Sequence, residues 1–200
     1  MKVLQWKYKE GFIISFGLLL TGFAIEYISS GTKIKLSWPF NIYFGIVFIS
    51  LLVFINYYVR GRQIVKWFSC KYASVSVIST FSLLVLLIGF IPQNDNHLFT
   101  VAGRLGLDRL TTSWPFIIIL IYFLFVLGLV ILRKLTPLKR KNTGFLLNHT
   151  GLWIIVFAAG LGNGDLQRLV MKTKEDKTVG HAFDRNSRIY EMPLALKLIK

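Results

Sequence analysis

Five separate runs of apolar residues, each about as long as a bilayer is thick, constrain the fold of this chain more than any other feature. The runs extend over residues 11–28, 39–59, 73–91, 114–132 and 145–161. A bilayer core of about 30 Å needs roughly 20 apolar residues in helical conformation, and a helix satisfies its backbone polar groups internally. The sequence therefore predicts an all-α integral membrane protein with about five transmembrane helices, formed by residues 1–162.

The first run is preceded by Lys2, Lys7 and Lys9, as in a secretory signal peptide. A signal peptide also needs a cleavage site with small residues. The stretch "AIEYISSG" at the end of the run offers no such site. We therefore expect this run to be a retained membrane helix.

The basic residues between the runs predict an orientation. Lysines and arginines gather in residues 60–71 and again in residues 133–141. Both segments should be cytoplasmic, because Lys and Arg are enriched in the inner loops of membrane proteins. The alternate loops carry fewer basic residues, and Asp95 and Asp108 offset part of that charge. The N-terminus should then be cytoplasmic and the tail from Gly162 extracytoplasmic.

The composition agrees with a membrane protein. Hydrophobic residues make up 54% of the 200 residues and charged residues only 16%, which is more apolar surface than a soluble domain of this size can bury. The net charge of +15 would suggest nucleic-acid binding in a soluble protein. Here the basic residues separate apolar runs, so we expect membrane lipid and no nucleic acid as a partner. Cys70 is the only cysteine, which excludes an internal disulfide and a Cys-x-x-Cys redox pair.

The tetrapeptide "SWPF" occurs twice, at residues 37–40 and 113–116. Serine caps a first helical turn, proline is favoured at the start of a helix, and tryptophan prefers the headgroup layer. We expect each copy to begin a helix that enters from the outside, with Ser37 and Ser113 as caps. An ancestral repeat is a weaker alternative.

The composition changes after Gly162. Residues 163–200 are polar, and two strands are expected within them, around residues 166–173 and 193–199, separated by turn-rich sequence. Two strands alone are marginally stable in water. We therefore expect the start of an extracytoplasmic β-rich domain whose remainder is missing or comes from another chain.

The stretch "LLNHTGLWIIVFAAG", residues 146–160, places a histidine inside the fifth run. If the apolar region begins near Gly144, His149 lies about 7 Å into it at 1.5 Å per residue. An ionisable residue within a span is a functional-site hypothesis by default, and a neutral imidazole ligates haem iron or another transition metal. We predict that His149 is a cofactor-binding residue and a ligand of haem iron. Trp153, one turn further on, is expected to line the same flat ligand.

The alternative is that His149 and Asn148 hydrogen-bond only to neighbouring helices, as polar residues in membrane bundles often do. The other polar candidates have simpler explanations. Glu26 is expected to meet water at the outer end of the first span, and His97 and His181 to be exposed in outer segments. The sequence contains no phosphate-binding glycine loop, no His-Glu-x-x-His and no nucleophile elbow, so we predict no autonomous catalysis.

From "GFLLNHTGLWIIVFAAGLGNGDLQRLVM" the sequence resembles the ResB/Ccs1 family of system II cytochrome c biogenesis. In that family a membrane helix bearing a histidine leads into a large extracytoplasmic domain. The "TSWPF" helix entry, the "TPLKRKNTGFLLNH" approach and the "GDLQRL" exit are most similar to Bacteroides-type members, and the resemblance is strongest over residues 113–171. The family is usually described with three helices before the soluble domain, whereas this sequence predicts five.

The resemblance implies a protein of the bacterial cytoplasmic (inner) membrane that works with a CcsA-type partner. Together they carry haem across the membrane, keep it reduced and present it to apocytochrome c, so that the pair acts as a haem lyase. The tryptophan-rich motif of the CcsA partner is absent here, which implies the ResB half alone. His149 is the position that matches the family's membrane histidine. The competing hypothesis is a non-haem transporter or a structural subunit that anchors an outside domain.

Overall fold

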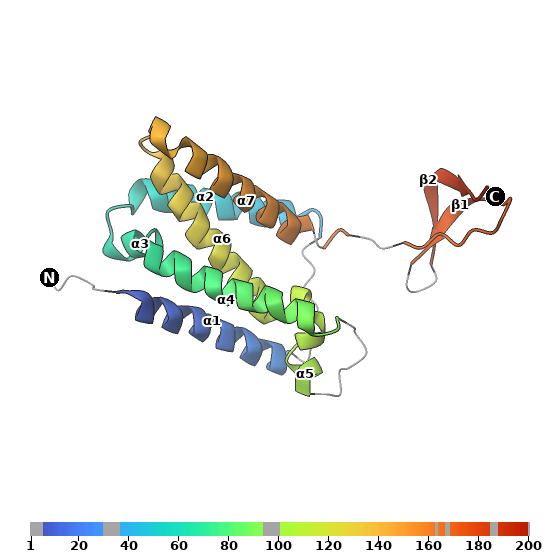
Figure 1. Ribbon diagram of the computed structural model, residues 1–200, viewed down its shortest axis with the longest axis horizontal. Coiled ribbons are helices and arrows are strands. Elements are labelled where there is room, and N and C mark those ends of the chain that lie inside the picture. The colour runs from blue at the N-terminus through green and yellow to red at the C-terminus, as the bar shows by residue number, and fades with distance from the viewer. Residues whose placement is uncertain are drawn as a thin grey trace. The chain divides into compact units, whose positions relative to one another are not determined.

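The computed structural model describes residues 6–29, 37–93, 101–162, 164–166, 169–184 and 188–199. They belong to two compact units, Met1–Gly164 and Asp165–Lys200. The first is a helical bundle and the second contains a small sheet (Figure 1). Each unit is described by itself.

The first unit contains five long helices, each long and apolar enough to cross a membrane. They are α1 (Tyr8–Ile28), α2 (Phe40–Tyr58), α4 (Lys71–Phe90), α6 (Trp114–Leu135) and α7 (Thr143–Gly162). The predicted number of long helices is confirmed, and every helix overlaps its predicted range. Shorter helices lie between them: α3 (Gln63–Phe68), α5 (Val101–Arg104), η1 (Leu107–Thr112) and η2 (Arg140–Asn142).

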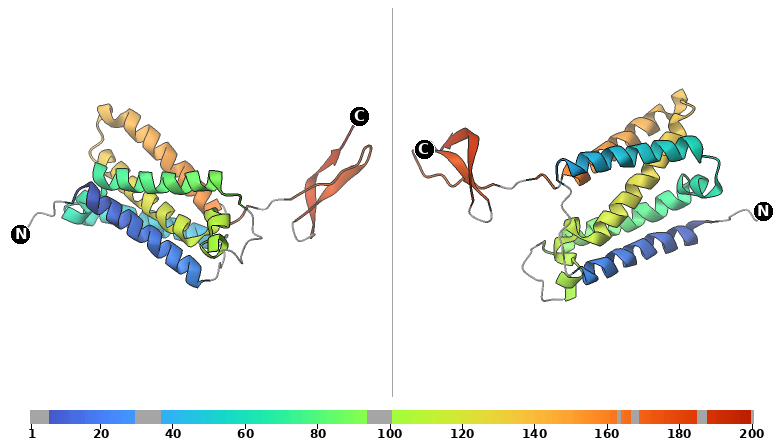
Figure 2. Two further views of the ribbon diagram at one scale, coloured as in Figure 1. Left: turned by 60° about the horizontal axis from the view of Figure 1, so that its bottom comes forward. Right: turned by 180° about the vertical axis from the view of Figure 1, so that it is seen from behind.

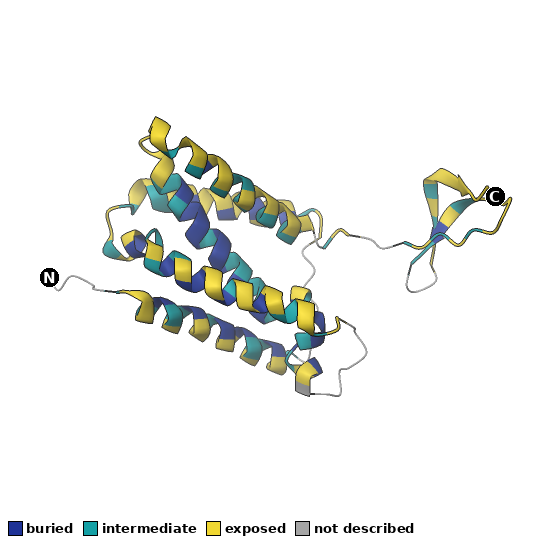
Figure 3. Ribbon diagram, viewed as in Figure 1, coloured by how far each residue is buried: buried dark blue, intermediate teal, exposed yellow. Residues whose placement is uncertain are grey.

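Helix α6 is the centre of the bundle. It packs against α1 and α4 on one flank and against α2 and α7 on the other (Figures 1 and 2). Its side chains supply much of the hydrophobic core, including the buried Ile119, Val126 and Leu129. Of the most apolar 18 residues of α6, 50% are buried, against 6% in the corresponding window of the α7 segment (Figure 3).

The C-terminal end of α6 is held by a side chain from the loop after α2. The last carbonyls of a helix have no partner within the helix. The guanidinium of Arg60 donates hydrogen bonds to the backbone carbonyls of Arg133 and Thr136 and to the Thr136 hydroxyl. A cation at this end also interacts favourably with the helix dipole.

The two "SWPF" segments begin helices with different registers: α2 starts at Phe40, after the proline, and α6 starts at Trp114, before it. Neither helix has a side-chain cap from its serine. The Ser113 hydroxyl donates instead to the carbonyl of Leu110 at 2.8 Å. The prediction of serine caps is therefore wrong. The backbone N–H of Trp114, at the start of α6, donates instead to a side chain of α1, that of Glu26.

The second unit is an antiparallel hairpin of β1 (Thr178–Phe183) and β2 (Ile189–Lys197). The register shifts between Val179, which pairs with Leu196, and His181, which pairs with Glu191. The extra residues of β2 at this point include Pro193, which has no N–H to donate to a ladder and favours such an irregularity.

Only the second of the two predicted strands is present. Residues 193–197 belong to β2, whereas the described part of residues 166–173 makes only an isolated bridge, from Val170 to Phe183. The strand that pairs with β2 is β1, which the sequence did not indicate. Strands β1 and β2 are close along the chain, and between them the Asp184 N–H donates to the Arg188 carbonyl at 3.0 Å. The sheet is therefore a local hairpin.

Candidate functional site

His149 lies in the second turn of α7 (Thr143–Gly162) and is half-buried. Its Nδ1 is 2.8 Å from the backbone carbonyl oxygen of Phe145. Because a carbonyl oxygen only accepts hydrogen bonds, Nδ1 is the donor, and in the uncharged form of the ring Nε2 then has the lone pair. The imidazole also stacks on the Phe145 ring, with 3.7 Å between the ring centroids. Both contacts fix the ring and leave Nε2 as the atom that can bind a ligand.

The hydrogen bond and the ring stacking of His149 both involve Phe145 of the same helix. Nε2 meets no hydrogen-bonding group among the described residues, and Asn148 is exposed. The bonds to neighbouring helices that the simpler hypothesis requires are therefore not found in the described part of the chain. A hydrogen bond from one imidazole nitrogen to a carbonyl is the usual support of a histidine that ligates a metal through the other nitrogen.

Trp153 joins α7 to α6. Its indole Nε1–H donates to the backbone carbonyl of Leu124 at 2.9 Å, and its ring stacks on Phe157 with centroids 4.5 Å apart. Gly128 of α6 makes room for it, since a Cβ there would lie 3.2 Å from Nε1. Trp153 is thus held by packing within the bundle, one turn after His149.

The outer face of α7 is apolar and exposed. Leu152, next to His149, is 46% exposed, and Leu147 and Ile155, about 160° and 120° round the helix from His149, are 78% and 68% exposed. At 3.6 residues per turn, Leu152 lies about 60° around the helix from His149 and Trp153 about 40° on the other side. His149, which is half-buried, therefore lies at the border between the face packed on α6 and the exposed face.

The residues present fit haem better than a bare metal ion. In the described part of the chain, no group of three or more His, Cys, Asp or Glu side chains could hold a metal. A porphyrin supplies four equatorial nitrogens and needs the protein only for its axial ligands, and the half-buried His149 could supply one of them. His181 is exposed on β1 with its ring edge-on to Phe183, and His97 lies outside the described residues.

A second polar site lies at the opposite end of the bundle. The carboxylate of Glu26, only 1% exposed, accepts a hydrogen bond from the Arg109 guanidinium at 2.9 Å. Its other oxygen accepts the backbone N–H of Trp114 at 2.9 Å. Glu26 thus satisfies the first turn of α6, where an anion is also favoured by the helix dipole. The expectation that this carboxylate meets water is wrong.

The loop before α6 is shaped around this carboxylate. Gly106 has a φ of +68°, and a Cβ there would lie 2.8 Å from the Glu26 Oε1, so a residue with a side chain would be strained and would collide. Arg109 also donates to the carbonyl of Gly103 at 3.2 Å, and its Nη1 is 3.9 Å from the Asp108 carboxylate. One feature of the sequence could have indicated this site: Glu26 is the only acidic residue in the first apolar run, and a charged residue within a span usually pairs with another group.

No protein-family model, no curated protein and no solved structure matches this chain.

Proposed function

We propose that this chain is the ResB-type membrane component of a system II cytochrome c biogenesis complex, which delivers haem for attachment to apocytochrome c. It would span the bacterial cytoplasmic membrane five times, with the N-terminus cytoplasmic and the β unit extracytoplasmic. The basic segments at residues 60–71 and 133–141 support this orientation, because both lie at the same end of the bundle, joined by Arg60.

The observation that carries the proposal is the free Nε2 of His149. Its Nδ1–H is held by the Phe145 carbonyl and its ring by the Phe145 side chain. These contacts set the tautomer that a metal ligand requires before any ligand arrives. Haem bound there would supply the iron porphyrin that is transferred to the cytochrome.

A CcsA-type partner would cover the exposed face of α7. Such a partner would pack beside Leu152, which is exposed about 60° round α7 from His149. In a membrane, helices associate by close packing of such apolar faces. Residues of this chain then do three things: His149 ligates, Phe145 orients the imidazole, and Trp153 holds α7 on α6. Attachment of haem to the apocytochrome would belong to the complex.

The test is the haem content of the purified complex. The chain is co-expressed with a CcsA-type partner, and the Soret absorbance per complex is compared among wild type, His149→Ala and the matched control Asn148→Ala. We expect His149→Ala to lower the Soret absorbance per complex at least about tenfold. Removing only a residue that supports a metal ligand already costs about 10–100-fold in affinity, and this variant removes the ligand itself. Added imidazole should restore part of the absorbance, and Asn148→Ala should behave as wild type.

Unchanged absorbance and unchanged cytochrome c maturation in His149→Ala would remove His149 from the site. A complex that contains no haem with all partners present would favour the alternative, a non-haem transporter or an anchor for the outer unit.

A further inference from the structure

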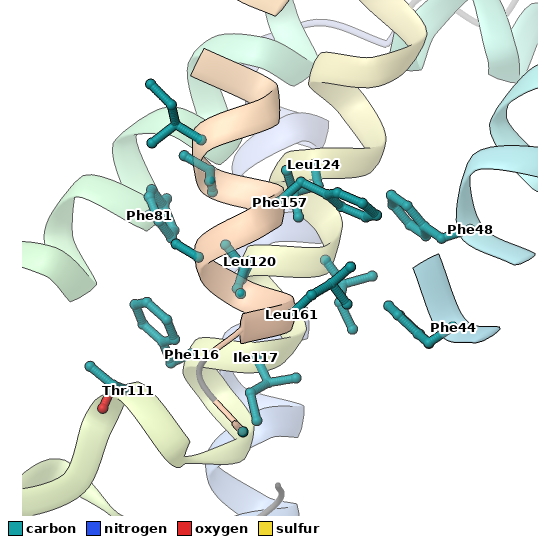
Figure 4. A pocket seen from close by; sticks show the side chains of 16 residues that line it. Phe44, Phe48, Phe81, Thr111, Phe116, Ile117, Leu120, Leu124, Phe157 and Leu161 are labelled. Atoms are coloured by element: carbon teal, nitrogen blue, oxygen red, sulfur yellow. The ribbon is translucent and has the colours of Figure 1, made fainter. Parts of the chain in front are cut away.

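The cavity of the helical unit offers nothing to a charged ligand. It lies among α2, α4, α6 and α7 and is lined by phenyl rings and aliphatic side chains (Figure 4). Thr111 has the only polar side chain among the lining residues that the structure describes. A charged ligand therefore fits the ends of the bundle and not this cavity.

The two ends of the bundle differ in how their charges are balanced. At one end Arg109 is paired within the chain, with Glu26 at 2.9 Å and Asp108 at 3.9 Å. The opposite end carries nine basic residues, four in residues 60–71 and five in residues 133–141, and neither segment contains Asp or Glu. We call these nine residues the basic end. None of their side chains forms an ion pair with a described residue, so the chain itself does not balance their charge.

The fold brings the two basic segments together. The guanidinium of Arg60 donates to the carbonyls of Arg133 and Thr136, so two arginines from different segments are neighbours. The Nη1 of Arg133 is enclosed by the protein and has no hydrogen-bond partner among the described residues. Glu10 of α1 is the only acid described at this end of the bundle, and its carboxylate already accepts the Lys7 N–H at 2.7 Å. Because like charges held together repel, this arrangement favours the binding of an anion from outside the chain.

The side chains around the basic end indicate that the anion is a lipid headgroup. Tyr57 and Tyr58, in the last turn of α2 and just before Arg60, are 79% and 71% exposed. Leu138, between basic residues of the second segment, is 68% exposed. Exposed tyrosines at the end of a membrane helix prefer the headgroup layer, and basic clusters next to membrane helices attract anionic lipids. The basic end therefore belongs at the depth of the headgroup phosphates of the cytoplasmic leaflet.

We propose that the basic end is a binding site for the headgroup phosphate of an anionic phospholipid. Arg62 and Lys134 are exposed and supply charge to the phosphate, whereas Arg60 remains bound to the end of α6. This goes beyond the orientation of the helices, because it predicts a lipid that binds the extracted protein with a preference for a negative headgroup. The inference rests on the membrane insertion proposed above and is independent of the haem site.

The test is native mass spectrometry of the full-length, delipidated protein in detergent, titrated with two lipids that have the same acyl chains. Dioleoylphosphatidylglycerol is anionic and dioleoylphosphatidylethanolamine is zwitterionic, and inorganic phosphate is added as a competitor. The variant is the double substitution Arg62→Gln with Lys134→Gln. The matched control is Arg104→Gln with Lys174→Gln, which also removes two exposed basic side chains but outside the basic end, so both double variants have the same net charge.

We expect the wild type and the control to bind phosphatidylglycerol more tightly than phosphatidylethanolamine. The affinity of Arg62→Gln with Lys134→Gln for phosphatidylglycerol should be lower by about 25-fold, since each basic residue near an anionic surface contributes about 5-fold. Equal affinities of the wild type for the two lipids, or of the two double variants for phosphatidylglycerol, would overturn the proposal. Displacement of phosphatidylglycerol by an equal concentration of inorganic phosphate would also overturn it, because the ligand would then be a soluble anion. The titration needs neither haem nor a partner protein, so its failure is distinguishable from that of the His149 test.

Discussion

Helices α6 and α7 have similar lengths and both are strongly apolar, yet the bundle uses them differently. Helix α6 is packed on both flanks and held at both ends, by Glu26 at Trp114 and by Arg60 at Arg133. Helix α7 is joined to α6 along one side through Trp153 and is exposed on the other. The difference teaches that apolarity alone identifies a span, whereas the placement of single polar groups tells which span is the core and which remains available to another molecule.

The largest effect is expected at the N-terminal end of α6. Glu26→Ala leaves Arg109 buried without its closest carboxylate, and breaking a buried ion pair in this way costs about 3–5 kcal/mol. The free energy of unfolding of the detergent-solubilised protein, followed by circular dichroism, measures this loss. Arg104→Ala is the control, because Arg104 is exposed in the same segment and should change stability by less than about 0.5 kcal/mol.

A second variant sharpens the result at Glu26. The double substitution Glu26→Leu with Arg109→Met removes both charges, so it should be less destabilising than Glu26→Ala alone. If Glu26→Ala and Arg104→Ala left the free energy of unfolding equally unchanged, the ion pair would not stabilise the end of α6. One of the differences between α6 and α7 would then be contradicted.

An intermediate effect is expected at Gly128, where α6 meets both α2 and α7. A Cβ at Gly128 would lie 2.7 Å from Leu52 Cδ1 of α2 and 3.2 Å from Trp153 Nε1 of α7, so Gly128→Leu should overpack this contact and cost about 1–3 kcal/mol. Gly151→Leu on α7 is the matched control, because a Cβ at Gly151 meets nothing within 4 Å. Thermal unfolding compares the two. Equal losses of stability would mean that the outer face of α7 is packed as tightly as α6.

A smaller effect is expected at Trp153, which joins α7 to α6. Trp153→Phe keeps an aromatic ring against Phe157 but removes the hydrogen bond to the Leu124 carbonyl, which is worth about 1 kcal/mol. Denaturant unfolding measures the difference. Trp153→Ala should be clearly worse, because it also removes the packed ring; no difference between the two variants would show that the hydrogen bond, and not the ring, holds α7.

The sequence predicted the parts of this fold that depend on local pattern. Five apolar runs became five long helices, because length and apolarity are properties of each segment alone. The pair of Glu26 and Arg109 was missed because the two residues are far apart in the chain, and only the fold brings them together. The cap of α6 was assigned to Ser113 for the same reason: a local residue was expected where Glu26 of α1 supplies the bond.

The role of His149 as a ligand stays a prediction. His149 was singled out by its depth in an apolar run, and its position at the border of the exposed face of α7 agrees with a role toward another molecule. Trp153 was expected to line the ligand, and the bond of its indole to Leu124 gives it a packing role that spacing along one helix does not reveal. Strand β1 was missed because sheet pairing depends on a partner strand, not on one segment.

The central claim is that the imidazole of His149 is held through Nδ1–H with Nε2 open to a ligand. Nitrogen NMR of protein labelled with ¹⁵N-histidine measures it directly, since the chain has only three histidines and the spectrum of His149→Gln identifies the resonances. We predict that Nδ1 carries the proton in the uncharged form of the ring, and that the Nε2 resonance is lost or shifts strongly when haem is loaded in the complex. A ring protonated at Nε2, or an Nε2 resonance that haem leaves unchanged, would contradict it.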